Sequence, residues 1–272
     1  MAKLLLTIII VGFTFTVNSQ QNAKDNSLSK YSYLLKETLD SKTVGWATGF
    51  LVKTKHSNYL LISNYHVLDA YDLYKDSPIN KNFDQIWLRY YDKKENRNKF
   101  FLVKSRNYKS KTKEKISSSN HPDIEYCLLK TLPFSMEKNS IENYIYNFPI
   151  DTKSISRTIS FGFPNNIINT DLSNLQSVNN TDLEGNLVSD YNNGTVNLKI
   201  YNKSDTNIYV ITGNLREGRS GSPIFLNYTN TQLGESVIFG GVYSLAVPEM
   251  DRGVAVKPKI TIEFIINEMR RY

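Results

Sequence analysis

The stretch NLREGRSGSPIF, residues 214–225, carries Ser220 in a glycine-rich turn that runs into Pro223 and an apolar segment. Gly218 and Gly221 allow the backbone to turn sharply and to present N–H groups to a developing oxyanion. An ordinary turn that opens a strand contains the same residue types. The stretch therefore leaves two interpretations open: Ser220 is a nucleophile, or it belongs to a structural turn.

Short strand-like segments rich in tyrosine, threonine and isoleucine recur on both sides of this stretch. They are predicted at residues 47–54, 58–68, 83–92, 100–105, 124–131, 158–164, 195–201, 207–213, 222–227, 236–245 and 253–258. Many short strands with turns between them indicate an all-β sandwich or a pair of barrels. Residues 131–157 break the pattern and are predicted to form a linker.

The C-terminal segment has a different period. Ile262, Ile265, Ile266 and Met269 fall at helical spacing, with Thr261 placed to cap the helix. We therefore expect a terminal amphipathic helix that packs on the second half of the protein.

The N-terminal residues 1–19 are predicted to be a signal peptide. Lys3 precedes an apolar run from Leu4 to Val17, and small residues follow at the expected cleavage position. The run is shorter than the roughly 20 residues that span a bilayer. The mature protein is therefore expected to be exported, periplasmic or secreted, without stable membrane insertion. Cys127 is the only cysteine, so the chain cannot form an internal disulfide.

The net charge of +7 owes much to residues 104–115, which are interpreted as a solvated basic loop. The sequence lacks the signature of a nucleic-acid-binding module. With three scattered histidines and one cysteine, no metal-ligand spacing is present, although a structural calcium in a loop stays possible. We expect no cofactor and a monomeric protein.

An alcohol becomes a nucleophile only beside a base, and the base needs an acidic partner that sets its tautomer. His56 lies in a polar turn and His121 precedes a proline in a loop, whereas His66 follows an apolar strand and can face a cleft. Asp123 stands immediately before the apolar run 124–129. A carboxylate at the start of a buried strand can be partly buried and held in one orientation.

Several stretches together resemble the chymotrypsin-like serine proteases, in the disulfide-free bacterial form. ATGFLV and LISNYHVL (within 47–68) resemble the family's glycine-containing strand and the strand that ends in its base histidine. DIEYCLLK (123–130) resembles its Asp-Ile-Ala-Leu-Leu segment, and GRSGSP (218–223) resembles its nucleophile loop. SVIFGGVYSLA (236–246) and RGVAVKP (252–258) resemble the strands that follow. The order of His66, Asp123 and Ser220 along the chain also matches the order of the family's catalytic residues.

The resemblance implies two packed six-stranded antiparallel β-barrels with a C-terminal α-helix. It divides the chain into a signal peptide (1–19), an N-terminal extension (20–44), a first barrel (45–140) and a second barrel with the helix (141–272). It implies a polypeptide substrate cleaved through an acyl-enzyme. The implied catalytic residues are Ser220 as nucleophile, His66 as general base and Asp123 as its orienting acid.

Further roles follow from the same resemblance. The N–H groups of Gly218 and Ser220 would form the oxyanion hole. The implied substrate-binding residues are Asn214 at the base of the specificity pocket, Ser244, Leu245 and Ala246 on the cleft strand, and Gly253 on the pocket wall.

The sequence departs from the family at two places. Arg219 stands where digestive members have the aspartate that receives a newly cut N-terminus, so we expect no activation of that kind. The SGSP loop resembles that of glutamyl endopeptidases, but Tyr243 or Ser244 occupies the position where those enzymes place a histidine. Arg216 and Arg219 would favour an acidic substrate. The primary specificity stays open.

Two other functions compete with this interpretation of the sequence. A catalytically silent member of the same fold would use its cleft as a binding or interaction module, and an intact set of chemical residues counts against it. An esterase of the α/β-hydrolase class requires Gly-x-Ser-x-Gly, but residue 222 is a serine, and its triad begins with the nucleophile.

Overall fold

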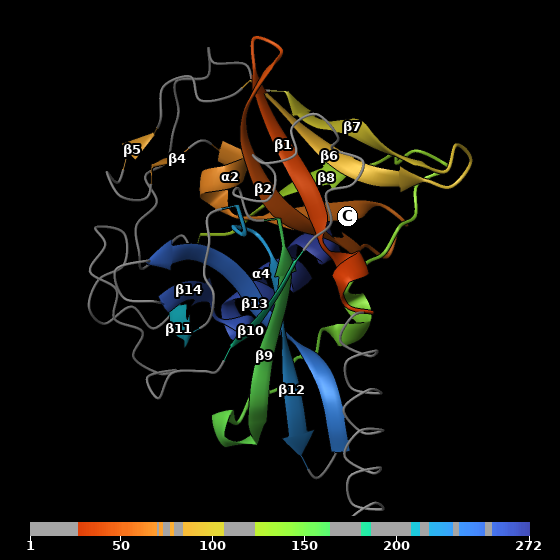
Figure 1. The fold of residues 1–272 in the computed structure, drawn as a ribbon. Helices are drawn as coiled ribbons and strands as arrows, with labels where there is room; N and C mark the ends of the chain where they lie inside the picture. Colours follow the sequence, from red (N-terminus) through yellow and green to blue (C-terminus); the bar gives the residue numbers. More distant parts are fainter. Residues whose placement is uncertain are drawn as a thin grey trace, which may run out of the picture.

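The computed structural model describes residues 27–69, 71–72, 77–78, 84–105, 123–163, 181–185, 208–212, 218–230, 234–247 and 252–272. The described residues form two six-stranded antiparallel sheets and a C-terminal α-helix, which confirms the predicted all-β class (Figure 1). The predicted signal peptide 1–19 and the predicted strand at 195–201 lie outside the described residues. In the part of the chain that is described, no helix has the length and apolar character needed to cross a membrane.

The first sheet has the strand order β7-β6-β1-β2-β3-β8. Its strands are β1 (Tyr33–Leu39), β2 (Lys42–Lys53), β3 (Tyr59–Ser63), β6 (Gln85–Asp92), β7 (Arg97–Ser105) and β8 (Glu125–Leu129). β1 lies inside this sheet, because it pairs with both β2 and β6. The sheet therefore begins at Tyr33, within the range 20–44 that the sequence analysis set apart as an extension. The apolar side chains of Tyr33, Leu34 and Leu35 explain the difference, since all three are buried.

The second sheet has the strand order β10-β9-β12-β13-β14-β11. Its strands are β9 (Ile155–Gly162), β10 (Thr181–Gly185), β11 (Ile208–Thr212), β12 (Pro223–Asn230), β13 (Gly234–Val247) and β14 (Arg252–Val256). A separate two-stranded pair joins β4 (Tyr71–Asp72) to β5 (Ser77–Pro78). The closure of each six-stranded sheet into a barrel stays a prediction.

The segment between β8 and β9 matches the predicted linker. Its named elements are the short 3-10 helices η2 (Glu142–Tyr144) and η3 (Thr152–Ser154), and isolated bridges join Met136 to Asp92 and Ser140 to Leu51 of the first sheet. The segment crosses from one sheet to the other. A third 3-10 helix, η1 (Ser29–Tyr31), precedes β1.

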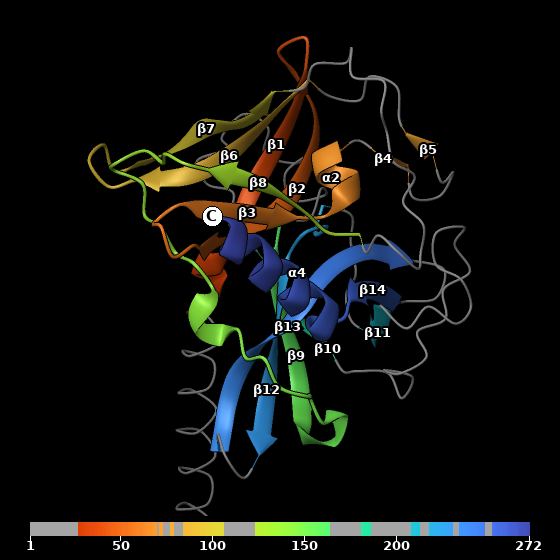
Figure 2. The ribbon, with the colours of Figure 1, turned by 180° about the vertical axis from the view of Figure 1, so that it is seen from behind.

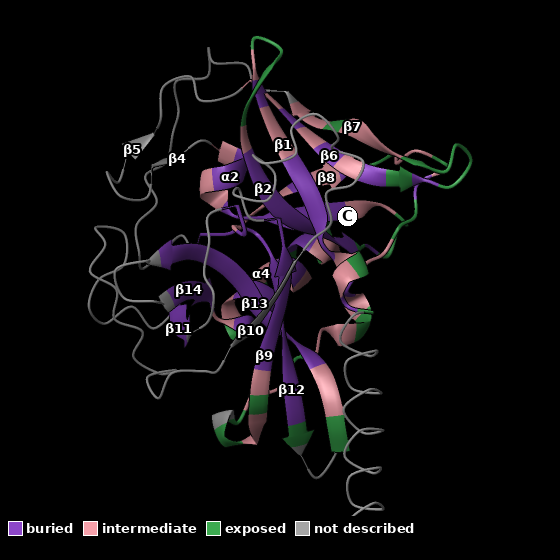
Figure 3. Cartoon of the chain, viewed as in Figure 1, coloured by how far each residue is buried: buried purple, intermediate pink, exposed green. Residues whose placement is uncertain are grey.

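The two sheets share a hydrophobic core. Phe50 and Ile62 of the first sheet belong to the same buried cluster as Phe225 and Phe239 of the second. Burial of each such side chain contributes about 1.5–3 kcal/mol, so this shared core fixes how the sheets face each other. Figure 3 shows buried residues concentrated where the sheets meet and exposed residues at the far ends of the hairpins.

The terminal helix α4 (Pro258–Arg271) packs across the back of the molecule, between the two sheets (Figure 2). Ile262 and Ile265 belong to the shared core, as their spacing predicts. The predicted cap at Thr261 was wrong. Pro258 begins the helix, and the Thr261 hydroxyl lies inside it and donates to the carbonyl of Lys257 at 3.1 Å. A proline suits this position because the first helical N–H has no partner within the helix.

Candidate active site

His66 lies on the short helix α2 (Tyr65–Asp69), which follows β3 directly. The N–H of Leu68 donates to the carbonyl of Asn64 and closes the turn. Val67 and Leu68 are buried in the core of the first sheet, and this anchors the helix. The His66 side chain keeps 18% of its surface exposed, so it is held at the edge of the core and stays accessible.

The structure brings Asp123 to His66, as the sequence analysis expected. Nδ1 of His66 lies 2.9 Å from Oδ2 and 3.1 Å from Oδ1 of a fully buried carboxylate. The backbone N–H of His66 also donates to Oδ1, at 3.1 Å. Because a carboxylate only accepts hydrogen bonds, Nδ1 is the nitrogen that carries the hydrogen in the neutral imidazole, which makes Nε2 the proton acceptor of that form.

Two further side chains hold Asp123, and their contacts to it were missed from the sequence. The buried Ser244 hydroxyl donates to Oδ2 at 2.5 Å. The buried Asn64 amide donates to the Asp123 backbone carbonyl at 2.7 Å. The family resemblance places Ser244 on the substrate strand, and no local signal marks Asn64 except its place two residues before His66. Both contacts join residues far apart in the chain.

Ser220 sits on the tight turn that its flanking glycines predicted. Gly218 has φ +90° and Gly221 has φ +85°, a region that disfavours side chains. The N–H of Ser222 donates to the carbonyl of Arg219, which closes the turn. The N–H of Gly221 donates to the carbonyl of Tyr243, which attaches the turn to β13.

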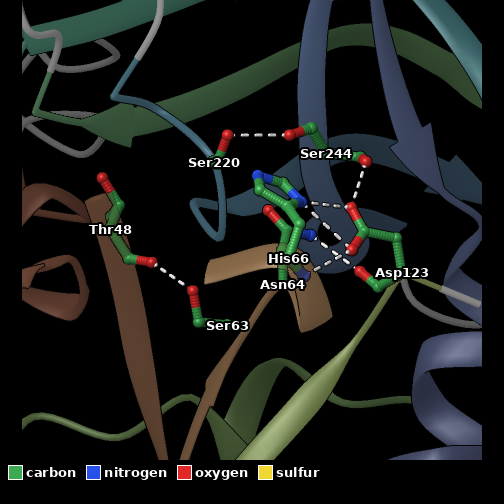
Figure 4. Close-up of polar contacts among 7 residues, drawn as sticks. All are labelled: Thr48, Ser63, Asn64, His66, Asp123, Ser220 and Ser244. Carbon is green, nitrogen blue, oxygen red and sulfur yellow. Dashed lines mark hydrogen bonds and ion pairs between the residues drawn. The ribbon is translucent and has the colours of Figure 1, made fainter. Parts of the chain in front are cut away.

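The Ser220 hydroxyl donates to the backbone carbonyl of Ser244 at 2.9 Å. Among the hydrogen bonds of the described residues, none joins Ser220 to His66. Figure 4 shows the ring nitrogen of His66 that faces away from Asp123 on the side where Ser220 lies. The three predicted residues are thus gathered in one place, with the serine hydroxyl turned to a different acceptor.

The two N–H groups predicted to form the oxyanion hole belong to Gly218 and Ser220. No backbone carbonyl within the described ranges accepts a hydrogen bond from either of them. Backbone N–H groups on a tight turn can form a concave site for an anion. This arrangement can stabilise negative charge that develops on a bound carbonyl oxygen.

The predicted substrate-binding residues lie on neighbouring strands. Leu245 and Ala246 of β13 pair with Val254 and Gly253 of β14, and the register shifts between Tyr243 and Leu245. Ser244 lies at this irregularity, which turns its hydroxyl to Asp123 and its carbonyl to Ser220. Asn214 and Arg216 lie outside the described residues. Contact of these residues with a substrate stays a prediction.

Arg219 differs from the surface residue that the sequence suggested. It is 3% exposed, and its Nη1 donates to the carbonyl of Ser160 at 3.5 Å. A buried guanidinium is not available to an acidic side chain of a substrate, so Arg219 gives no support to an acidic specificity. In the described ranges, no three His, Cys, Asp or Glu side chains gather as metal ligands.

No protein-family model matches the chain, and no curated protein matches it. Solved structures similar to it include the serine endoprotease from Yersinia pestis, with 16% identity, a TM-score of 0.46 and coverage of 88% of this chain. The alignment covers 63% of the Yersinia chain, less than two thirds of its length. The active form of the Rv3671c protease from M. tuberculosis has 13% identity and a TM-score of 0.45, over 85% of this chain and 78% of its own.

Proposed function

We propose that this protein is an exported serine endopeptidase that cleaves peptide bonds through an acyl-enzyme. The observation that carries the proposal is the pairing of His66 Nδ1 with the buried carboxylate of Asp123, on the side of Ser220. An imidazole oriented by a buried acid, with a serine beside its second nitrogen, is the arrangement that activates an alcohol. Export, by removal of residues 1–19, is part of the proposal and rests on the sequence alone.

In the proposed mechanism, the Ser220 hydroxyl leaves the Ser244 carbonyl and turns to Nε2 of His66. His66 accepts the hydroxyl proton while Oγ attacks the substrate carbonyl carbon, and the resulting oxyanion is bound by the N–H groups of Gly218 and Ser220. Asp123 stays a carboxylate and stabilises the imidazolium. His66 then gives the proton to the leaving amine. Water repeats the sequence on the acyl-enzyme and releases the acid.

The test is covalent labelling of the purified mature protein with a fluorophosphonate, followed by peptide mapping and by hydrolysis of a peptide library. We expect labelling at Ser220, which disappears in Ser220→Ala and falls strongly in His66→Ala. Turnover should fall by about 10⁶ in Ser220→Ala, as in other triads. Absence of both labelling and hydrolysis, in protein shown by circular dichroism to be folded, would refute the proposal.

The second candidate is a catalytically silent protein of the same fold that acts as a binding module. One observation favours it: the Ser220 hydroxyl is bonded to Ser244 rather than to His66. The same labelling experiment separates the two functions, because a silent protein leaves Ser220 unmodified while its fold is intact.

A further inference from the structure

We infer that Thr48 is a positioning residue for the oxyanion hole, acting on the nucleophile turn from the opposite sheet. The inference rests on the proposed function. Thr48 lies in β2 of the first sheet and is fully buried, whereas the turn that it contacts precedes β12 of the second sheet. The sequence by itself predicts no separate role for Thr48.

Thr48 contacts the turn at two carbonyl groups. Its backbone N–H donates to the carbonyl of Ser220 at 2.9 Å, and its hydroxyl donates to the carbonyl of Gly218 at 3.1 Å. These are the two residues whose N–H groups are predicted to form the oxyanion hole. A single residue 170 positions away from Gly218 thus holds both of them.

The contacts complete a pattern along the turn. The carbonyl of Arg219, between the other two, accepts from the N–H of Ser222 at 2.9 Å. The carbonyls of Gly218, Arg219 and Ser220 therefore each accept a hydrogen bond, and Thr48 supplies the donors for the first and the third. The N–H groups of Gly218 and Ser220 have no backbone acceptor in the described ranges. The two carbonyls that Thr48 holds belong to the peptide groups on either side of the one that carries the N–H of Ser220, so they limit the directions that this donor can take.

The direction of the Thr48 hydroxyl is itself determined by its surroundings. Oγ1 accepts a hydrogen bond from the N–H of Phe163 at 3.1 Å, so its single hydrogen is directed to Gly218. The Thr48 carbonyl accepts from the Ser63 hydroxyl at 2.7 Å, a contact drawn in Figure 4. Thr48 is thus fixed on both sides before it contacts the turn.

The hydrogen bond from the Thr48 hydroxyl matters because its acceptor is the carbonyl of a glycine. At φ +90° a glycine has little intrinsic preference for one peptide orientation, so external contacts decide it. The peptide group that follows Gly218 carries the N–H of Arg219. Without the Thr48 hydroxyl this group can rotate, and the next peptide group, which carries the N–H of Ser220, loses a fixed neighbour that determines its direction. A donor whose direction varies stabilises the transition state less, even when the substrate still binds.

The experiment compares Thr48→Val, Thr48→Ser and Ser32→Ala in the full mature chain. Thr48→Val keeps the shape and the backbone N–H but removes the hydroxyl, whereas Thr48→Ser keeps the hydroxyl. Ser32→Ala is the matched control, because it removes another buried hydroxyl that donates to a carbonyl of the second sheet, that of Phe161 at 2.7 Å. Thr48→Ala is the substitute if Thr48→Val does not fold.

For Thr48→Val, kcat should fall about tenfold to a hundredfold with KM little changed. The affinity for a peptide aldehyde, which forms a hemiacetal oxyanion on the serine, should fall by the same factor. Thr48→Ser should restore both, and Ser32→Ala should leave both unchanged at a temperature where all variants are folded.

Unchanged kcat in the folded Thr48→Val protein, beside an active wild type, would overturn the inference and leave the proposed function standing. Equal losses in Thr48→Ser or in Ser32→Ala would also overturn it, because they would indicate general destabilisation. A wild type that neither hydrolyses peptides nor reacts with a fluorophosphonate would remove the proposed function, and the inference with it.

Discussion

The hydroxyl of Ser220 donates a hydrogen bond to the backbone carbonyl of Ser244 over 2.9 Å. The hydroxyl of the same Ser244 donates to Asp123. Ser244 therefore contacts the proposed nucleophile through its backbone and the proposed acid through its side chain. This double contact is produced by the irregularity of β13 at this position, where the register with β14 shifts.

Ser244→Ala separates these two contacts, since it removes the hydroxyl and keeps the carbonyl. A hydrogen bond to a charged group contributes about 1.5–3 kcal/mol, so kcat/KM for a peptide substrate should fall about tenfold to a hundredfold. The control is Ser160→Ala, which removes a buried hydroxyl that donates to the carbonyl of Pro223 at 3.0 Å. Equal kcat/KM in Ser244→Ala and the wild type would show that Asp123 is held without Ser244.

Asn64→Ala should loosen the link between the helix of His66 and the start of β8. The buried amide donates to the Asp123 carbonyl at 2.7 Å, and loss of one partner leaves that carbonyl without this donor. The expected destabilisation is about 1–3 kcal/mol in urea unfolding, with a fall in kcat/KM. Asn64→Asp should not rescue either property, because a carboxylate cannot donate. Stability at the wild-type level in both variants would contradict the assigned contact.

Gly221→Ala should disrupt the nucleophile turn. A Cβ at this position would lie 2.1 Å from the Thr48 carbonyl oxygen and 2.1 Å from the Ser63 hydroxyl oxygen, and the backbone has φ +85°. We expect a loss of about 3 kcal/mol or more in the free energy of unfolding. Gly234→Ala is the control, because its φ is +62° but no atom lies within 4 Å of the added Cβ. Its cost should be limited to the backbone strain, about 1 kcal/mol. Similar losses in the two variants would argue against the close packing around Gly221.

Asp92 should make the first sheet sensitive to acid. The hydrogen bond from the Lys99 ammonium group, together with the N–H groups of Lys94 and Glu95, lowers the pKa of Asp92 from 3.8 to about 2. A carboxyl whose pKa is lower in the folded than in the unfolded state stabilises the protein at pH values above the unfolded-state pKa. This stabilisation is lost as the pH falls toward the folded-state pKa. In urea unfolding, Asp92→Asn should therefore be less stable than the wild type at pH 7, and the difference should shrink between about pH 4 and 2. A difference that does not vary over this range would contradict the assignment.

Much of the site could be predicted because its residues carry local signals. Ser220 lies between two glycines, His66 ends an apolar strand and Asp123 begins another. The structure gathers all three. The boundary at Gly45 was less successful, because β1 has no motif and is recognised only by its pairing with β2 and β6. The cap at Thr261 was wrong because Pro258, a residue that suits the first position of a helix, already begins the helix three residues earlier.

The sequence by itself determined the all-β class, the terminal helix and the candidate nucleophile, base and acid. Each of these depends on periodicity or on the chemistry of a few adjacent residues. Only the tertiary structure decided the parts played by Thr48, Asn64 and Ser244. Six of their hydrogen bonds join residues between 24 and 172 positions apart, and in five of the six at least one of the two groups belongs to the backbone, which every residue carries. No local pattern can identify such partners until packing of the two sheets brings them together.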